Sequence, residues 1–130
     1  MALLLAACPS FERRWNEYLS SDTYEAGLLY IDLGELVHHL VDLMQRGQTS
    51  ELAALFAVVE RLHVEGEPFV REAATIGFLE TLQNFAGNNG VDCERFEPYL
   101  LRESAKWWGE LNRFWAGESP YVGAGLKKPE

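Results

Sequence analysis

The stretch PFVREAATIGFLETLQNF, residues 68–85, decides how the rest of this 130-residue chain must fold. Its apolar residues cover nearly the whole circumference of a helix, and proline is tolerated at the first helical position. A helix that is apolar all round is buried, so other helices must pack around it. Gly77 and the alanines beside it let those neighbours approach closely.

The segments on either side carry apolar residues at helical spacing. Helices are expected at about residues 10–20, from 24 or 28 to 46, from 49 or 50 to 65, and 98–117, with a short helical turn capped by Asp92. No stretch alternates polar and apolar residues as a half-buried strand does. The sequence therefore predicts an all-α, compact bundle of about five helices around a buried central helix. It forms one domain over residues 1–116, followed by a Gly- and Pro-rich tail over residues 117–130.

The charge balance restricts the class of partner. The chain has 11 basic and 20 acidic residues, a formal net charge of −9, and no Lys or Arg between Trp15 and Gln45. Such a chain repels nucleic acids and anionic membrane surfaces, whereas it attracts a basic protein and accelerates its association. The excess of acid is interpreted either as a means of keeping the protein soluble or as a docking surface, and in the second case we expect a protein partner with a basic surface.

The cysteines and the apolar segments indicate the compartment. Cys8 and Cys93 are far apart and form neither a disulfide framework nor a thiolate metal motif, which suits a reducing environment. The apolar stretch at residues 2–7 is shorter than the h-region of about 7–15 residues in a signal peptide. No segment approaches the roughly 20 apolar residues of a membrane span. We expect a cytoplasmic protein.

A polar stripe follows the second expected helix. Its members recur every three or four residues, and they are Asp32, Glu35, His39 and Asp42. Leucines define the opposite, inner face, so the stripe is expected to face solvent. It is interpreted as an ordinary solvated face, a divalent metal site or a surface that docks basic side chains. As candidate partner contacts we take the stripe and three further acids expected to be exposed: Glu65, Glu67 and Glu72.

Glu-x-x-His occurs twice, at Glu35 and His38 and at Glu60 and His63. Two such pairs, with a glutamate from each of two other helices, form the di-iron site of ferritin-like bundles. A metal-dependent bundle enzyme is therefore the alternative function. It requires ligands that point inwards, whereas Glu35 and His38 are expected on the polar side.

Glu80 lies on the central helix and must be paired, hydrogen-bonded or protonated if it is partly buried. An ion pair with Arg61 or Arg71, or a cap for a neighbouring helix, is the expected solution. No nucleophile motif and no phosphate-binding glycine loop accompanies it. The sequence therefore predicts no catalytic residue, no metal and no cofactor.

Two family resemblances carry the functional expectation further. The run EPFVREAA at residues 67–74, followed by Gly77, Leu79 and Leu82, resembles the second helix of a HEAT repeat, which implies one HEAT-like hairpin with the preceding helix. A longer pattern resembles small acidic bacterial proteins of largely undefined function, some of them similar to immunity proteins of polymorphic toxin systems. It comprises CPSF at 8–11, DLGE at 32–35, HLV at 39–41, VERL at 59–62, GFLE at 77–80 and residues 108–115.

The second resemblance implies a non-enzymatic immunity protein, monomeric or homodimeric, that neutralises a cognate bacterial toxin. Its acidic surface would cover the active site or substrate groove of that toxin. A homo-oligomeric adaptor domain is the other alternative.

Overall fold

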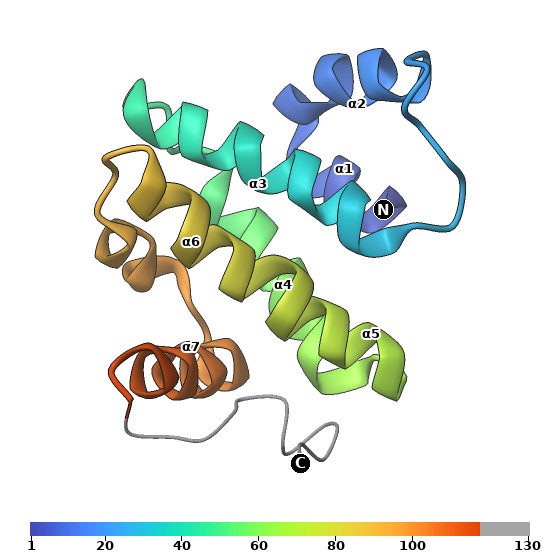
Figure 1. Ribbon diagram of the computed structural model, residues 1–130. Helices are drawn as coiled ribbons and strands as arrows, with labels where there is room; N and C mark the ends of the chain where they lie inside the picture. Colours follow the sequence, from blue (N-terminus) through green and yellow to red (C-terminus); the bar gives the residue numbers. More distant parts are fainter. Residues whose placement is uncertain (118–130) are drawn as a thin grey trace.

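The computed structural model describes residues 1–117, and every regular element in this range is a helix (Figure 1). The predicted all-α class is therefore confirmed, whereas the predicted tail lies outside the described residues apart from Gly117. None of the described helices combines the length and the hydropathy that crossing a bilayer requires. In chain order the elements are α1 (Ala2–Ala7), η1 (Pro9–Phe11), α2 (Glu12–Leu19), α3 (Leu29–Gln45), α4 (Leu52–Glu65), α5 (Pro68–Glu72), η2 (Ala73–Glu80), α6 (Thr81–Asn88), η3 (Cys93–Tyr99) and α7 (Arg102–Trp115).

The apolar stretch at residues 68–85 forms the centre of the molecule. Its elements α5, η2 and α6 follow one another without a break, and η2 packs on α3, α4 and α7. Phe78, Leu79 and Leu82 are at most 1% exposed. The first turn departs from the all-round burial that the sequence predicts, because Phe69 is 58% exposed.

The segment η2 is a π-helix, which the sequence did not indicate. At its end the Thr81 hydroxyl donates to the carbonyl of Ile76 over 3.4 Å. Segments of π-helix are rare and frequently occur at functional sites. Within η2, Gly77 lies against α3, where an added Cβ would come within 3.2 Å of Leu33. The predicted close approach at this glycine is therefore present.

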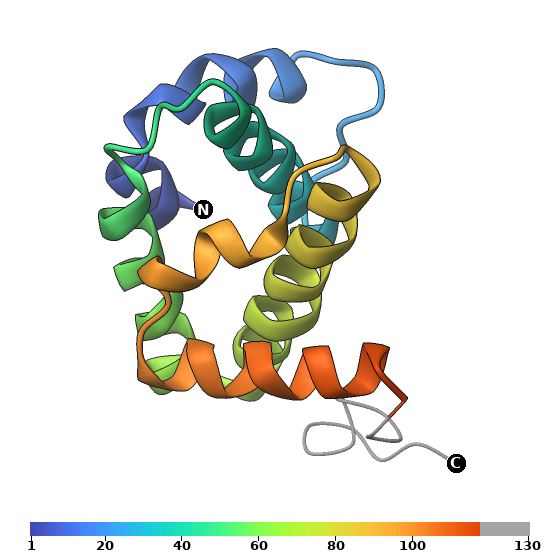
Figure 2. The same ribbon diagram turned by 90° about the vertical axis from the view of Figure 1, so that its left-hand side faces the viewer.

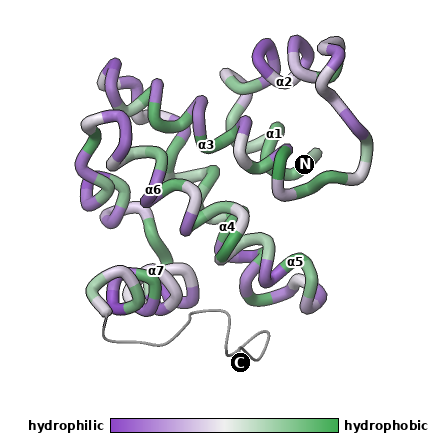
Figure 3. Tube along the Cα trace, in the orientation of Figure 1, coloured by the Kyte–Doolittle hydropathy of each residue, from purple (hydrophilic) through white to green (hydrophobic). Residues whose placement is uncertain are grey.

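Peripheral helices cover the central ones on two sides. The N-terminal α1 packs on α4, and the mostly hydrophilic α2 packs on α3 (Figures 1 and 3). At the other end α7 runs across α4 and the central helix (Figure 2).

The expected helix ends are correct in some places and wrong in others. The Asp92 carboxylate accepts a hydrogen bond from the backbone N–H of Glu94, so the predicted cap of this short helix is present. The start of α4 lacks the predicted Thr49 or Ser50 cap, because its N-cap residue is Glu51 and no side chain caps it.

Candidate functional site

The predicted stripe on α3 is largely covered by α2. Asp32 is 8% exposed and His39 is 7% exposed, so the prediction that both face solvent is wrong. The physical reason is that the amphipathic α2 packs on this polar face of α3, while Ser10 and Phe11 of the preceding η1 lie against His39. Burial raises the pKa of Asp32, whose Oδ1 has no hydrogen-bond partner among the described residues. Asp42 alone keeps a half-exposed side chain, which pairs with Arg46 at 2.7 Å.

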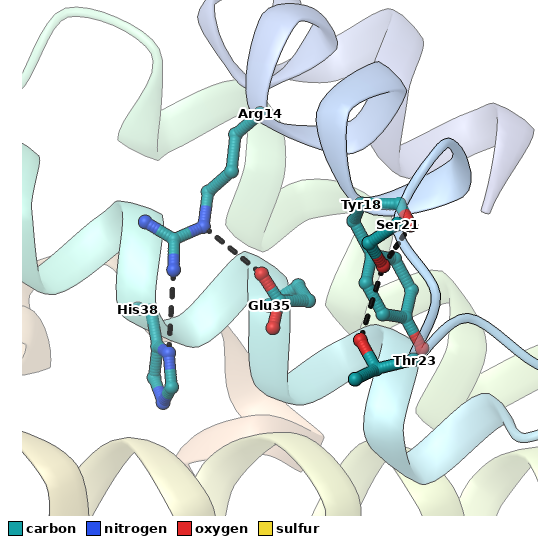
Figure 4. Close-up of polar contacts among 6 residues, drawn as sticks. All are labelled: Arg14, Tyr18, Ser21, Thr23, Glu35 and His38. Carbon is teal, nitrogen blue, oxygen red and sulfur yellow. Dashed lines mark hydrogen bonds and ion pairs between the residues drawn. The ribbon is translucent and has the colours of Figure 1, made fainter.

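The first Glu-x-x-His pair binds Arg14 of α2 (Figure 4). The Arg14 Nε donates to Glu35 Oε1 over 3.2 Å, and its Nη2 donates to His38 Nδ1 over 3.4 Å. The His38 ring also stacks on Phe85 of α6, with ring centroids 4.0 Å apart. These two residues therefore hold α2 and α6 against α3.

His39, the histidine of the stripe, belongs to a polar cluster at the start of α4. Ser10 donates its hydroxyl proton to Glu51 over 2.6 Å and accepts from His39 Nε2 over 2.8 Å. In this arrangement the ring nitrogen carries the proton, so His39 cannot act as the base for Ser10. The Cys8 thiol donates to the same carboxylate, and burial raises its pKa to about 12, which keeps it a protonated thiol. The cluster fixes residues 8–10 and has no activated nucleophile.

The second Glu-x-x-His pair fixes the start of α7. Glu60 accepts hydrogen bonds of 2.8 and 2.9 Å from the backbone N–H groups of Glu103 and Ser104, and a third from the Ser104 hydroxyl. That hydroxyl oxygen lies 3.0 Å from His63 Nδ1, and Thr75 Oγ1 lies 3.0 Å from His63 Nε2. A continuous chain of hydrogen bonds thus links α4, α7 and η2.

The protonation of this chain follows from its donors. The Ser104 hydroxyl donates to the Glu60 carboxylate, so His63 Nδ1 donates to Ser104 and His63 Nε2 accepts from Thr75. Burial lowers the pKa of His63, which favours this neutral ring. Within residues 1–117 no group of three or more His, Cys, Asp or Glu side chains is arranged to hold a metal ion. Both Glu-x-x-His pairs hold helices together.

A cavity of about 530 Å³ lies beside this chain of hydrogen bonds, between the first turns of the central helix and the start of α7. We call it the α5–α7 pocket. Its lining residues are His63, Pro68, Phe69, Arg71, Glu72, Thr75, Glu103 and Trp107.

The pocket combines two acidic side chains with aromatic rings. The hydroxyl of Tyr30 donates to Glu72 Oε1 over 3.1 Å, and the exposed Phe69 ring packs on Tyr30. The Lys106 ammonium lies 5.1 Å from the centre of the Trp107 ring, a cation–π distance. The side chains of Arg71 and Glu103 form no hydrogen bond or ion pair with other described residues.

The predicted acids therefore separate into two groups. The acids of the stripe lie on α3, and the other three lie at or beside the first turns of the central helix. Glu72 lines the pocket, Glu67 directly precedes its Pro68, and Glu65 is exposed at the same turn, where it pairs with Arg61 at 3.4 Å. We call these acids and Glu103 the acidic rim. Sequence reasoning missed Glu103 and Trp107, although their spacing of four residues in the first turns of α7 places both on one face.

Glu80 lies apart from the pocket lining and is half-buried. Burial raises the pKa of its carboxyl. The predicted ion pair with Arg61 or Arg71 is not formed, and no other described residue bonds its side chain. The carboxyl therefore takes up a proton more readily than an exposed glutamate.

Residues 1–116 match the family model described as a domain of unknown function, DUF7674. Neither a curated protein nor a solved structure matches the chain.

Proposed function

The chain belongs to the DUF7674 family, and we propose that it acts by binding a protein partner with a basic surface at the α5–α7 pocket. The observation that carries this proposal is the acidic rim around a cavity with an exposed aromatic ring. Glu72 and Glu103 line it, the exposed Glu67 precedes Pro68 of its lining, and Phe69 is 58% exposed.

A protein suits this surface better than a small metabolite. Interface hot spots combine aromatic anchors with charged groups at their edge, and the pocket supplies both through Phe69, Trp107 and the rim. The formal net charge of −9 adds long-range attraction for a basic partner. The hydrogen bonds at His63 connect α4, α7 and η2, so these side chains are engaged in holding the helices that form the pocket. This supports a binding role for the pocket.

We further propose that the partner is a cognate bacterial toxin and that the chain is a cytoplasmic immunity protein without catalytic activity. The support is the sequence resemblance together with the acidic rim, which fits a basic active site or substrate groove. In this proposal α4 and the central helix form a HEAT-like hairpin, whose turn at residues 66–67 contains the exposed Glu67.

The test measures association kinetics between the chain and the protein encoded by the adjacent gene. A triple variant, Glu67→Lys, Glu72→Lys and Glu103→Lys, should slow association about tenfold or more and weaken its dependence on salt. The matched control reverses three other exposed acids, Glu12, Glu25 and Glu94, so both variants change the net charge equally.

Slower association in the rim variant alone supports the proposal. An equal slowing in the two variants would show only an effect of net charge and would contradict the proposal. Asp42→Lys tests the remaining exposed part of the predicted stripe. If only this variant associates more slowly, the interface lies on α3 and not at the pocket. A neighbour that binds neither variant nor the unchanged chain overturns the toxin proposal.

A further inference from the structure

We propose that the α5–α7 pocket receives the side chain of one arginine of the partner. This inference rests on the proposed function and names the group that is recognised. The pocket brings two carboxylates, an aromatic ring and an uncommitted guanidinium to one cavity of about 530 Å³.

The two carboxylates come from different helices; the Glu72 carboxylate is held by a hydrogen bond, whereas at Glu103 the backbone is held and the carboxylate has no bond to another described residue. Glu72, at the end of α5, accepts the hydrogen bond from Tyr30. Glu103, in the first turn of α7, has its backbone N–H fixed by Glu60 over 2.8 Å. A guanidinium group has five N–H donors in one plane, so it can bind carboxylates on two sides at once, which a compact ammonium does less well.

The Trp107 ring provides a surface for the cation. In the structure the ammonium of Lys106 lies 5.1 Å from its centre, so a partner arginine that stacks on this ring takes the place of Lys106. The aliphatic stem of an arginine can pack on Phe69 while its head reaches the carboxylates.

Arg71 makes the pocket fit a peptide rather than an isolated cation. Its guanidinium lines the same cavity and bonds no described side chain or backbone group. A free cation would meet its repulsion, whereas the backbone carbonyls beside a peptide arginine can accept its hydrogen bonds. The floor adds no further charge, because His63 is neutral and satisfied by Ser104 and Thr75.

The experiment titrates the full chain with N-acetyl-arginine amide, N-acetyl-lysine amide and N-acetyl-norleucine amide. Two NMR signals report on the pocket: the indole N–H of Trp107 and the backbone N–H of Glu103. The arginine amide should shift both at about one tenth of the concentration that the norleucine amide needs. Glu72→Gln with Glu103→Gln should abolish this preference, and Glu12→Gln with Glu94→Gln should retain it.

Equal shifts by the arginine and norleucine amides would overturn the inference, as would a preference that survives in the pocket variant. A stronger response to the lysine amide would replace arginine by lysine and would also overturn it. Because Glu72 also bonds Tyr30, the single variant Glu103→Gln repeats the test without touching that contact. If the amide binds but the adjacent-gene protein does not, the proposed function fails separately. If that protein needs the rim while the amide does not bind, only this inference fails.

Discussion

At the scale of single residues, Glu60 fixes the start of α7. One carboxylate accepts both backbone N–H groups at the start of α7 and the hydroxyl that orients His63. Burial by itself would raise the pKa of this carboxyl, but these hydrogen bonds outweigh burial and lower it. A negative group at a helix N-terminus is also favoured by the helix dipole. Glu60 therefore sets the position of Glu103, and with it one side of the pocket.

We predict that Glu60→Ala lowers the free energy of unfolding by about 1–3 kcal/mol, because two N–H groups and a buried hydroxyl lose their acceptor. Urea denaturation at neutral pH measures this. Glu110→Ala is the control on α7, the helix whose start Glu60 holds, and its exposed pair with Arg113 should contribute less than about 1 kcal/mol. Equal effects of the two substitutions would remove the special role of Glu60.

At the scale of elements, the turn between α4 and α5 fixes where the acidic rim lies. Gly66 separates the two helices in an extended conformation, with φ of −71° and ψ of 154°. A Cβ at this position would clash with the carbonyl oxygen of Leu62 and would lie 2.9 Å from Val70 Cγ1. Glycine is therefore required by close approach, and the short turn leads directly into Pro68 and Phe69 of the pocket lining.

We predict that Gly66→Ala destabilises the protein by about 1–3 kcal/mol, because the backbone must shift to admit the methyl group. Gly109→Ala should act in the opposite direction. This glycine lies within α7 and nothing lies within 4 Å of an added Cβ, so alanine should stabilise the helix by up to about 1 kcal/mol. Thermal unfolding should show a lower midpoint for Gly66→Ala and a higher midpoint for Gly109→Ala. An unchanged midpoint in Gly66→Ala would refute the close approach at this residue.

At the scale of the whole molecule, the histidines couple stability to pH. Burial is the main cause that lowers the pKa of all three, His38, His39 and His63. The folded chain thus binds their protons less readily than the unfolded chain does. As pH falls below about 6.5, the unfolded state takes up protons that the folded state refuses, so the free energy of unfolding decreases. The raised pKa values of Asp32 and Glu80 act in the opposite direction and offset part of the loss.

We predict that His63→Gln flattens the dependence of stability on pH between about 7 and 5, by at most about 1.4 kcal/mol per pH unit. Urea denaturation across this range measures the slope, which separates the titration from any loss of hydrogen bonds at a single pH. Below about pH 4.5 both proteins should lose further stability. The pKa values of Glu51 and Glu60 are lowered in the folded chain, so the unfolded chain takes up these protons first. A variant with the slope of the unchanged chain would exclude His63 as a contributor.

The sequence by itself determined the all-α class and the central helix, because the spacing of apolar residues and the residues at helix ends are local properties of the chain. It also identified Glu72 and Glu67 as candidate contacts. Only the tertiary structure decided the rest. A polar face on α3 does not reveal whether other helices cover it, and here η1 and α2 cover the face that carries Asp32 and His39. The roles of both Glu-x-x-His pairs depend on partners more than 20 residues away in the chain, Arg14 and Ser104. The pocket likewise exists only because α7 crosses the central helix and brings Glu103 and Trp107 to residues 68–75.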